Sequence, residues 1–117
     1  MTAALPDGAA QPAALVPHWL AAAERAELAA GVRTALGAAD VHPVTAVHLA
    51  DVLTELHVAA ARDLVWPASA ARVRLAAGWA DDVLPVRLSA AELASVLALP
   101  ALPGRLRARL DGRAGAR

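Results

Sequence analysis

The side chains that come closest to a metal-binding pattern are His48, Asp51 and Glu55, which recur at helical spacing. On a predicted helix these three share one narrow face. His57 falls on the opposite side, because nine residues at about 100° each turn it away from His48. A metal site needs three or four converging ligands, and this spacing matches none of the recurrent motifs such as H-E-x-x-H. We therefore expect a solvated polar stripe and no bound metal.

Residue types that support catalysis are few. The chain has no cysteine, which excludes thiolate zinc sites, iron–sulfur clusters and a cysteine nucleophile. Ser69, Ser89 and Ser95 lie in no G-x-S-x-G turn, and the glycines form neither a P-loop nor a dinucleotide-binding fingerprint. Asp81 and Asp82 are typical of a solvated turn. We predict that the protein is not an enzyme and binds no cofactor.

Arginine is concentrated at the C-terminal end of the chain. Residues 105–117 hold five arginines and one carboxylate, whereas residues 1–104 hold six arginines and ten carboxylates. A basic tail can contact nucleic-acid phosphates. The candidates for such contacts are Arg105, Arg107, Arg109 and Arg113. The alternative interpretations are a solubilising tail and a tail that binds an acidic protein surface.

The composition is apolar and rich in alanine. The 117 residues suffice for one domain, carry a formal net charge of zero, and are 58% hydrophobic, half of that fraction being alanine. No uncharged stretch reaches the roughly 18 apolar residues of a membrane span, so we expect a cytoplasmic protein without membrane contact. Phe, Tyr, Ile, Lys and Asn are absent, and all five have AT-rich codons, which indicates a GC-rich, bacterial gene.

Helical periodicity dominates the rest of the chain. Helices are expected over Pro17–Leu36, from between Asp40 and Thr45 to about Val65, from about Ala68 to Ala80 or Asp82, from Ser89 to before Pro100, and over roughly Arg105–Leu110. We exclude a strand over Val83–Leu88 because Pro85 interrupts it. The prediction is an all-α fold, a small antiparallel bundle of four main helices and a short fifth. Residues 17–110 form the domain, residues 1–16 a flexible leader and residues 111–117 a flexible basic tail.

One helix start carries a specific local signal. Ser89 can accept a hydrogen bond from the amide of Glu92, and the Glu92 carboxylate can reach back to the amide of Ser89. Leu88 and Leu93 fit the hydrophobic contact that flanks such a capping box. We therefore place a helix N-terminus at Ser89.

The second and third predicted helices, which end at about Val65 and at Ala80 or Asp82, are apolar on two sides, which is more apolar surface than a small bundle hides. We predict that part of it forms an exposed patch, and such patches mark association sites, with Trp a favoured anchor. The residues of this predicted patch are Leu75, Trp79, Val83, Val47 and Val58. The leading hypothesis is a non-catalytic protein–protein interaction module: an adaptor, an assembly component, a homo-oligomer or a small subunit. The alternative is a nucleic-acid-associated regulator that uses the arginine-rich tail.

Overall fold

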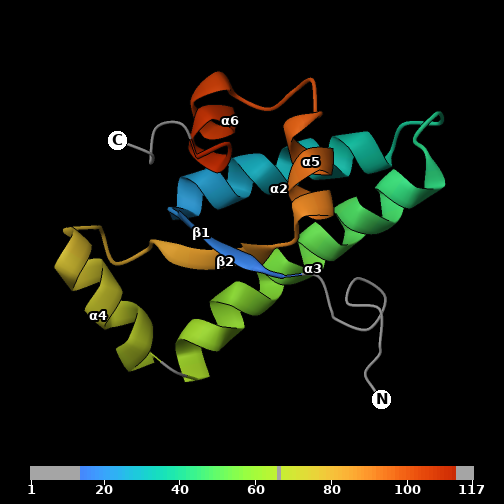
Figure 1. Cartoon of the computed structure of the whole chain (residues 1–117). Helices are drawn as coiled ribbons and strands as arrows, with labels where there is room; N and C mark the ends of the chain where they lie inside the picture. The colour runs from blue at the N-terminus through green and yellow to red at the C-terminus, as the bar shows by residue number, and fades with distance from the viewer. Residues whose placement is uncertain (1–13, 66, 113–117) are drawn as a thin grey trace, which may run out of the picture.

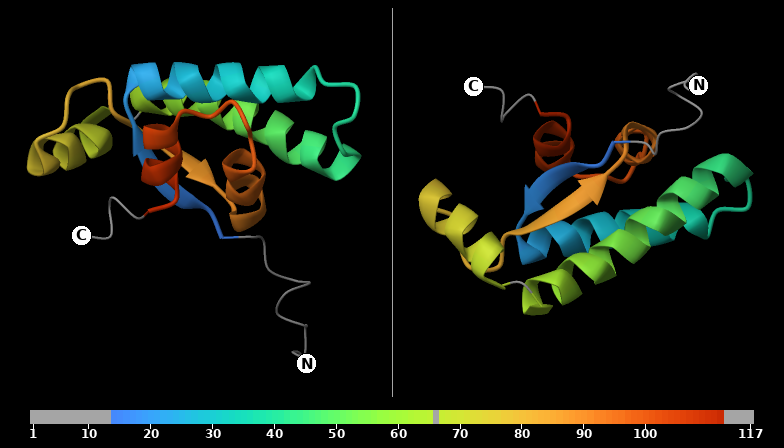
Figure 2. Two further views of the ribbon diagram at one scale, coloured as in Figure 1. Left: turned by 90° about the horizontal axis from the view of Figure 1, so that it is seen from above. Right: turned by 60° about the horizontal axis from the view of Figure 1, so that its bottom comes forward.

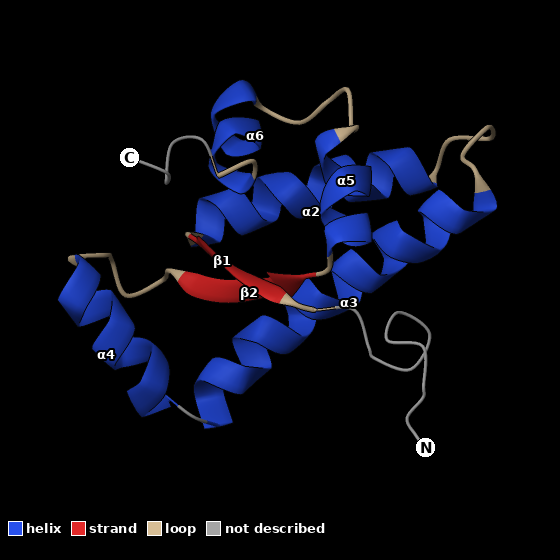
Figure 3. Cartoon of the chain, in the orientation of Figure 1, coloured by secondary structure: helices blue, strands red, loops and turns tan. Residues whose placement is uncertain are grey.

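The computed structural model describes residues 14–65 and 67–112, which form two strands and five helices. The elements are β1 (Val16–Leu20), α2 (Ala22–Leu36), α3 (Pro43–Val65), α4 (Pro67–Ala77), β2 (Leu84–Leu88), α5 (Ala90–Leu97) and α6 (Gly104–Leu110). Figure 3 shows the two strands as a short ribbon among the helices.

The domain has two layers. The long helices α2 and α3 lie side by side in one layer, and the ribbon of β1 and β2 lies across them together with α5 and α6 (Figure 2). α4 stands to one side of both layers (Figure 1). The core fills the space between the layers. Its fully buried members include Leu20, Leu28, Val32, Leu49, Val52, Val86, Leu88, Val96, Leu106 and Leu110.

The strands pair in an antiparallel register that places Val16 opposite Leu88 and Leu20 opposite Leu84. Side chains alternate between the two faces of a strand. Leu84, Val86 and Leu88 are buried, and of the residues opposite them Leu20 is buried and His18 half-buried, whereas Val16 at the start of β1 is exposed. Pro17, Trp19, Pro85 and Arg87 therefore lie on the outer face of the ribbon.

Both prolines occupy positions where the ladder needs no amide. The Arg87 N–H donates to Glu55 Oε2 on α3 at 2.7 Å, so Arg87 points its backbone away from β1. Hydrogen-bonding positions alternate along an antiparallel pair. Pro17, opposite Arg87, and Pro85, two residues before it, consequently also direct their nitrogens outward. Proline is tolerated in a strand at such edge positions.

The prediction of an all-α helical bundle is therefore wrong. The described residues form a mixed α/β fold, in which a two-stranded antiparallel sheet joins the beginning of the domain to its C-terminal half. Pro85 does not interrupt β2, since its missing N–H is not used. Pro17 does not start a helix, because residues 16–20 pair with β2 and α2 begins only at Ala22.

The helices themselves largely match their predicted ranges. α2 ends at Leu36 and α3 ends at Val65, as expected. α4 is shorter than predicted, because Gly78 adopts a left-handed conformation with φ of 71° and ends the helix after Ala77. Most of the predicted leader and tail, residues 1–13 and 113–117, lies outside the described residues, and Val16, assigned to the leader, begins β1.

The start of α2 is held by a residue from far along the chain. Asp82 Oδ2 accepts the Ala22 N–H at 3.1 Å. Arg25 Nη1 donates to the carbonyl oxygens of Leu20 at 2.8 Å and Asp82 at 2.6 Å. The Ala21 N–H is satisfied by Glu24 Oε1 at 2.8 Å. These contacts fasten the end of β1, the first turn of α2 and the loop before β2 to one another.

The predicted capping box at α5 is confirmed, and it generates a stability prediction. Ser89 Oγ accepts the Glu92 N–H at 3.1 Å, and Glu92 Oε1 accepts the Ser89 N–H at 2.9 Å. Ser89→Ala should lower the free energy of unfolding by about 1 kcal/mol, the usual cost of losing such a cap. Urea denaturation measures this loss. Ser89→Thr should keep most of the stability, and an equal loss in both variants would contradict the capping role.

Candidate functional site

The most exposed large apolar side chain of the described residues lies on α4. Leu75 is 83% exposed, and Val73 and Trp79 are also exposed. We define the α4 surface as Val73, Leu75, Trp79 and the adjoining Trp19. Among the described elements, α3 is the one with which α4 makes more than sparse contact. α4 thus extends from the domain with little cover (Figure 1).

The side chain that attaches α4 to the domain is an arginine. Arg74 is buried, and its Nη1 donates to the carbonyl oxygen of Val83 at 3.2 Å. Every other residue from 71 to 77 is exposed. At about 100° per residue, Val73 and Leu75 project from opposite flanks of the helix, on either side of Arg74. Val73 and Leu75 are consequently left outside the core.

The turn after α4 places Trp79 beside the ribbon. The Gly78 N–H donates to the carbonyl oxygen of Leu75 at 3.2 Å, and the Trp79 N–H donates to that of Arg74 at 2.9 Å. These two bonds and the left-handed Gly78 make a Schellman motif. The chain therefore reverses at Gly78, and the Trp79 ring lies 5.4 Å from that of Trp19, centroid to centroid, at a tilt of 39°.

The structure divides the five residues of the predicted patch. Leu75 and Trp79 belong to the α4 surface, and Val47 and Val58 are exposed on α3. Val83 is only 5% exposed, because the helix that would have carried it outward ends at Ala77 and Val83 instead lies directly before β2.

The two valines on α3 do not extend the α4 surface. Val47 and Val58 are eleven residues apart, which is about 16 Å along a helix. The exposed side chains of Asp51 and Thr54 lie between them on the same face. We therefore describe the α4 surface and the α3 valines as separate features.

The sequence predicts Val73 in the core stripe of its helix and Trp19 at the end of the bundle, whereas Val73 is exposed and Trp19 packs against Trp79. The signal for Trp19 was present in the alternation of Val16, His18 and Leu20, which is typical of a strand with Trp19 on its outer face. Recognising it required the knowledge that residues 16–20 form a strand.

The residues of the predicted polar stripe on α3, His48, Asp51 and Glu55, do not converge on one site. His48 Nδ1 lies 3.3 Å from Ser95 Oγ on α5, and Glu55 accepts the Arg87 amide from β2. Asp51 remains exposed. Across residues 14–65 and 67–112, no three histidine or carboxylate side chains form a group that could hold a metal ion. His48 and Glu55 connect α3 to the second layer.

Three of the four candidate arginines contact their own chain. Arg105 pairs with Glu27 at 3.5 Å and Arg109 with Glu24 at 3.1 Å. The two glutamates lie on α2, so these pairs connect α6 to that helix. The Arg107 guanidinium donates to the carbonyl oxygen of Leu97 and, at 2.5 Å, to that of Leu99, where α5 ends. Arg113 lies outside the described residues. These contacts fit a structural role and give no specific support to nucleic-acid binding.

Neither similarity to known proteins nor a membrane-spanning helix indicates a function for this chain. Comparison with protein-family models, curated proteins and solved structures finds no match to this chain. Of the helices in the described residues, none combines the length and the apolar character that crossing a bilayer requires.

His18, on the core-facing side of β1, generates a prediction about pH. Its Nε2 atom is buried and has no hydrogen-bond partner in the described part of the chain. Burial lowers the pKa of His18 below its usual value of 6.5. As pH falls through 6.5, the unfolded chain therefore takes up the proton before the folded one, and the free energy of unfolding decreases.

Urea denaturation at about pH 7.5 and about pH 5.5 measures this dependence. His18→Gln should show a smaller loss of stability at the lower pH than the wild type. The exposed His57 provides the control, since His57→Gln should leave the wild-type pH dependence in place. Identical pH dependence in His18→Gln and the wild type would contradict the effect of burial.

Proposed function

We propose that this chain is a non-catalytic protein–protein interaction module, an adaptor, assembly component or small subunit, that binds a protein partner through the α4 surface. The observation that carries the proposal is the exposure of Leu75, at 83%, on a helix whose buried anchor is Arg74. A cytoplasmic location remains part of the proposal.

The energetics of α4 support a partner. An isolated helix shorter than about 12 residues is marginal in water, and α4 has 11 residues. Fully burying a leucine or valine side chain contributes about 1.5–3 kcal/mol. A partner that covers Leu75 and Val73 would therefore stabilise both the complex and the helix itself.

The arrangement of the side chains favours one binding mode. Val73 and Leu75 lie on opposite flanks of α4, and the exposed Ala76 lies between them on the side away from Arg74. A flat surface would cover only one flank. A groove that receives α4 would cover both flanks, as in complexes where a helix inserts into an apolar groove. Trp79 and Trp19 lie at the end of α4, where they would contact the rim of that groove.

The experiment compares Leu75→Asp with a matched control, Thr54→Asp, which adds the same charge to the exposed face of α3. The full-length proteins are isolated from cells of the source organism. Co-purifying proteins are quantified by mass spectrometry, and the mass in solution is measured by size-exclusion chromatography with light scattering. Helicity by circular dichroism should be the same in all three proteins.

We expect the partner, or the second copy of the chain, to be lost in Leu75→Asp and retained in Thr54→Asp. Removing a central apolar anchor costs about 2 kcal/mol or more, which is about a thirtyfold loss of affinity. If Leu75→Asp retains both the wild-type mass and the wild-type set of co-purifying proteins, the α4 surface is not the interface. Absorbance at 260 and 280 nm in the same run reports any bound nucleic acid.

A further inference from the structure

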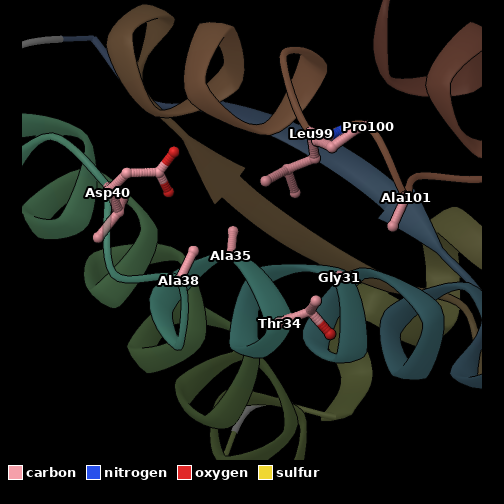
Figure 4. Close-up of a pocket in the computed structure, with 9 residues that line it drawn as sticks. Gly31, Thr34, Ala35, Ala38, Asp40, Leu99, Pro100 and Ala101 are labelled. Carbon is pink, nitrogen blue, oxygen red and sulfur yellow. The ribbon is translucent and has the colours of Figure 1, made fainter.

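A second feature of the molecule, far from α4, is an apolar groove of about 300 Å³. It lies between the C-terminal half of α2, the loop that follows α2, and the loop between α5 and α6 (Figure 4). α4 is at the opposite end of the molecule (Figure 1). The volume is at the lower end of the range for small-molecule sites.

The lining of the groove is uncharged except at one position. Gly31 and Ala35 come from α2, Ala38 from the following loop, and Leu99 and Pro100 from the α5–α6 loop. Asp40 also lines the groove, and Figure 4 shows its carboxylate turned toward Leu99 on the facing wall. The described residues supply Asp40 with no ion pair and no hydrogen bond. The apolar groove thus carries a single negative charge, on the exposed residue Asp40, which has no partner among the described residues.

Gly31 keeps one wall of this groove open. Glycine is the least favourable residue in a helix interior after proline, and Gly31 lies in the middle of α2. A Cβ atom at Gly31 would meet Leu99 Cδ1 at 3.8 Å, an ordinary van der Waals contact. Helix packing therefore does not require glycine at this position. What the missing side chain provides is space in the groove.

We propose that the groove binds a small-molecule aliphatic primary amine. The alkyl chain lies between Gly31 and Ala35 on one wall and Leu99 on the other, and the ammonium group pairs with the Asp40 carboxylate. A single carboxylate beside apolar walls suits an organic monocation. A divalent metal ion would require several oxygen ligands, which these walls lack. The site is independent of the α4 surface, so each can fail without the other.

The first test uses three probes of equal length: n-hexylammonium, n-hexanol and n-hexanoate. Binding to the full-length protein is followed by amide chemical shifts in two-dimensional proton–nitrogen NMR. We expect n-hexylammonium to shift the amides of Gly31, Ala35, Ala38 and Asp40 in a saturable manner and to bind more tightly than n-hexanol. We expect n-hexanoate to cause no saturable shift there.

Two variants with matched controls test the residues. Asp40→Asn should weaken n-hexylammonium binding about twofold to fivefold, the effect of losing an ion pair at an exposed site, whereas Asp51→Asn on the exposed face of α3 should not change it. Gly31→Ala should raise the Tm, because alanine favours the helix, and should weaken binding, because the methyl group enters the groove. If Gly31→Ala gains stability and loses n-hexylammonium binding, the glycine serves the ligand site and is not required for the stability of the fold.

Three results would overturn the proposal. Equal affinity for n-hexylammonium, n-hexanol and n-hexanoate would show that the groove does not distinguish ligands by their charge. Unchanged n-hexylammonium affinity in Asp40→Asn would remove the carboxylate from the site. A lysine blocked at both ends that binds at least about tenfold more tightly than n-hexylammonium, a difference of about 1.4 kcal/mol, would assign the groove to a protein side chain and not to a small molecule.

Discussion

The pairing of β1 with β2 is the constraint on which the rest of the domain depends. It brings Val16–Leu20 against Leu84–Leu88, segments separated by three helices. The ribbon that results supplies a continuous buried face, with Leu20, Val86 and Leu88 directed into the core. It also determines where the chain enters α2 and α5, because each helix follows its strand after a single residue. Without this pairing, α2 and α3 would have no second layer to cover their apolar faces.

The same pairing explains why α4 is free of the core. The chain must return from the end of α3 to the start of β2, and α4 lies within that return. It is fastened by the Arg74 contact to Val83 and by the turn that places Trp79 against Trp19. The other side chains described on α4, those of residues 71–73 and 75–77, are exposed. Val73 and Leu75 therefore stay exposed on this helix, and their exposure is the basis of the proposed partner site.

Local signals predicted the local elements well. The capping box of Ser89 and Glu92 lies within four residues, and the apolar periodicity of α3 lies within one helix, so both could be identified from the sequence. The strands could not be identified in the same way. Each has five residues, and each is stabilised by a partner far along the chain. The register places Pro17 and Pro85 where strand pairing needs no backbone N–H, and this register depends on both strands together.

The candidate surface could be predicted only in part, because some of its residues are placed by contacts between distant segments. Leu75 and Trp79 stand out by residue type, and the structure exposes both. Val83 was misplaced because the apolar spacing was followed past Gly78, where the helix ends. Trp19 was missed because its position on the outer face depends on the ribbon. The groove at Asp40 lies between α2 and the α5–α6 loop. These segments are far apart in the sequence, so residue spacing could not predict that they lie close together.

The two edge prolines have a consequence for assembly. A short sheet with open edges can recruit further strands and grow into a fibre. Here the four outward backbone positions are Pro17, Trp19, Pro85 and Arg87. The prolines have no amide hydrogen, and Glu55 accepts that of Arg87, which leaves Trp19 as the one outward amide of the ribbon without a described acceptor. The edges of this ribbon are therefore poor templates for a further strand, which lowers the tendency of an apolar, alanine-rich chain to form fibres.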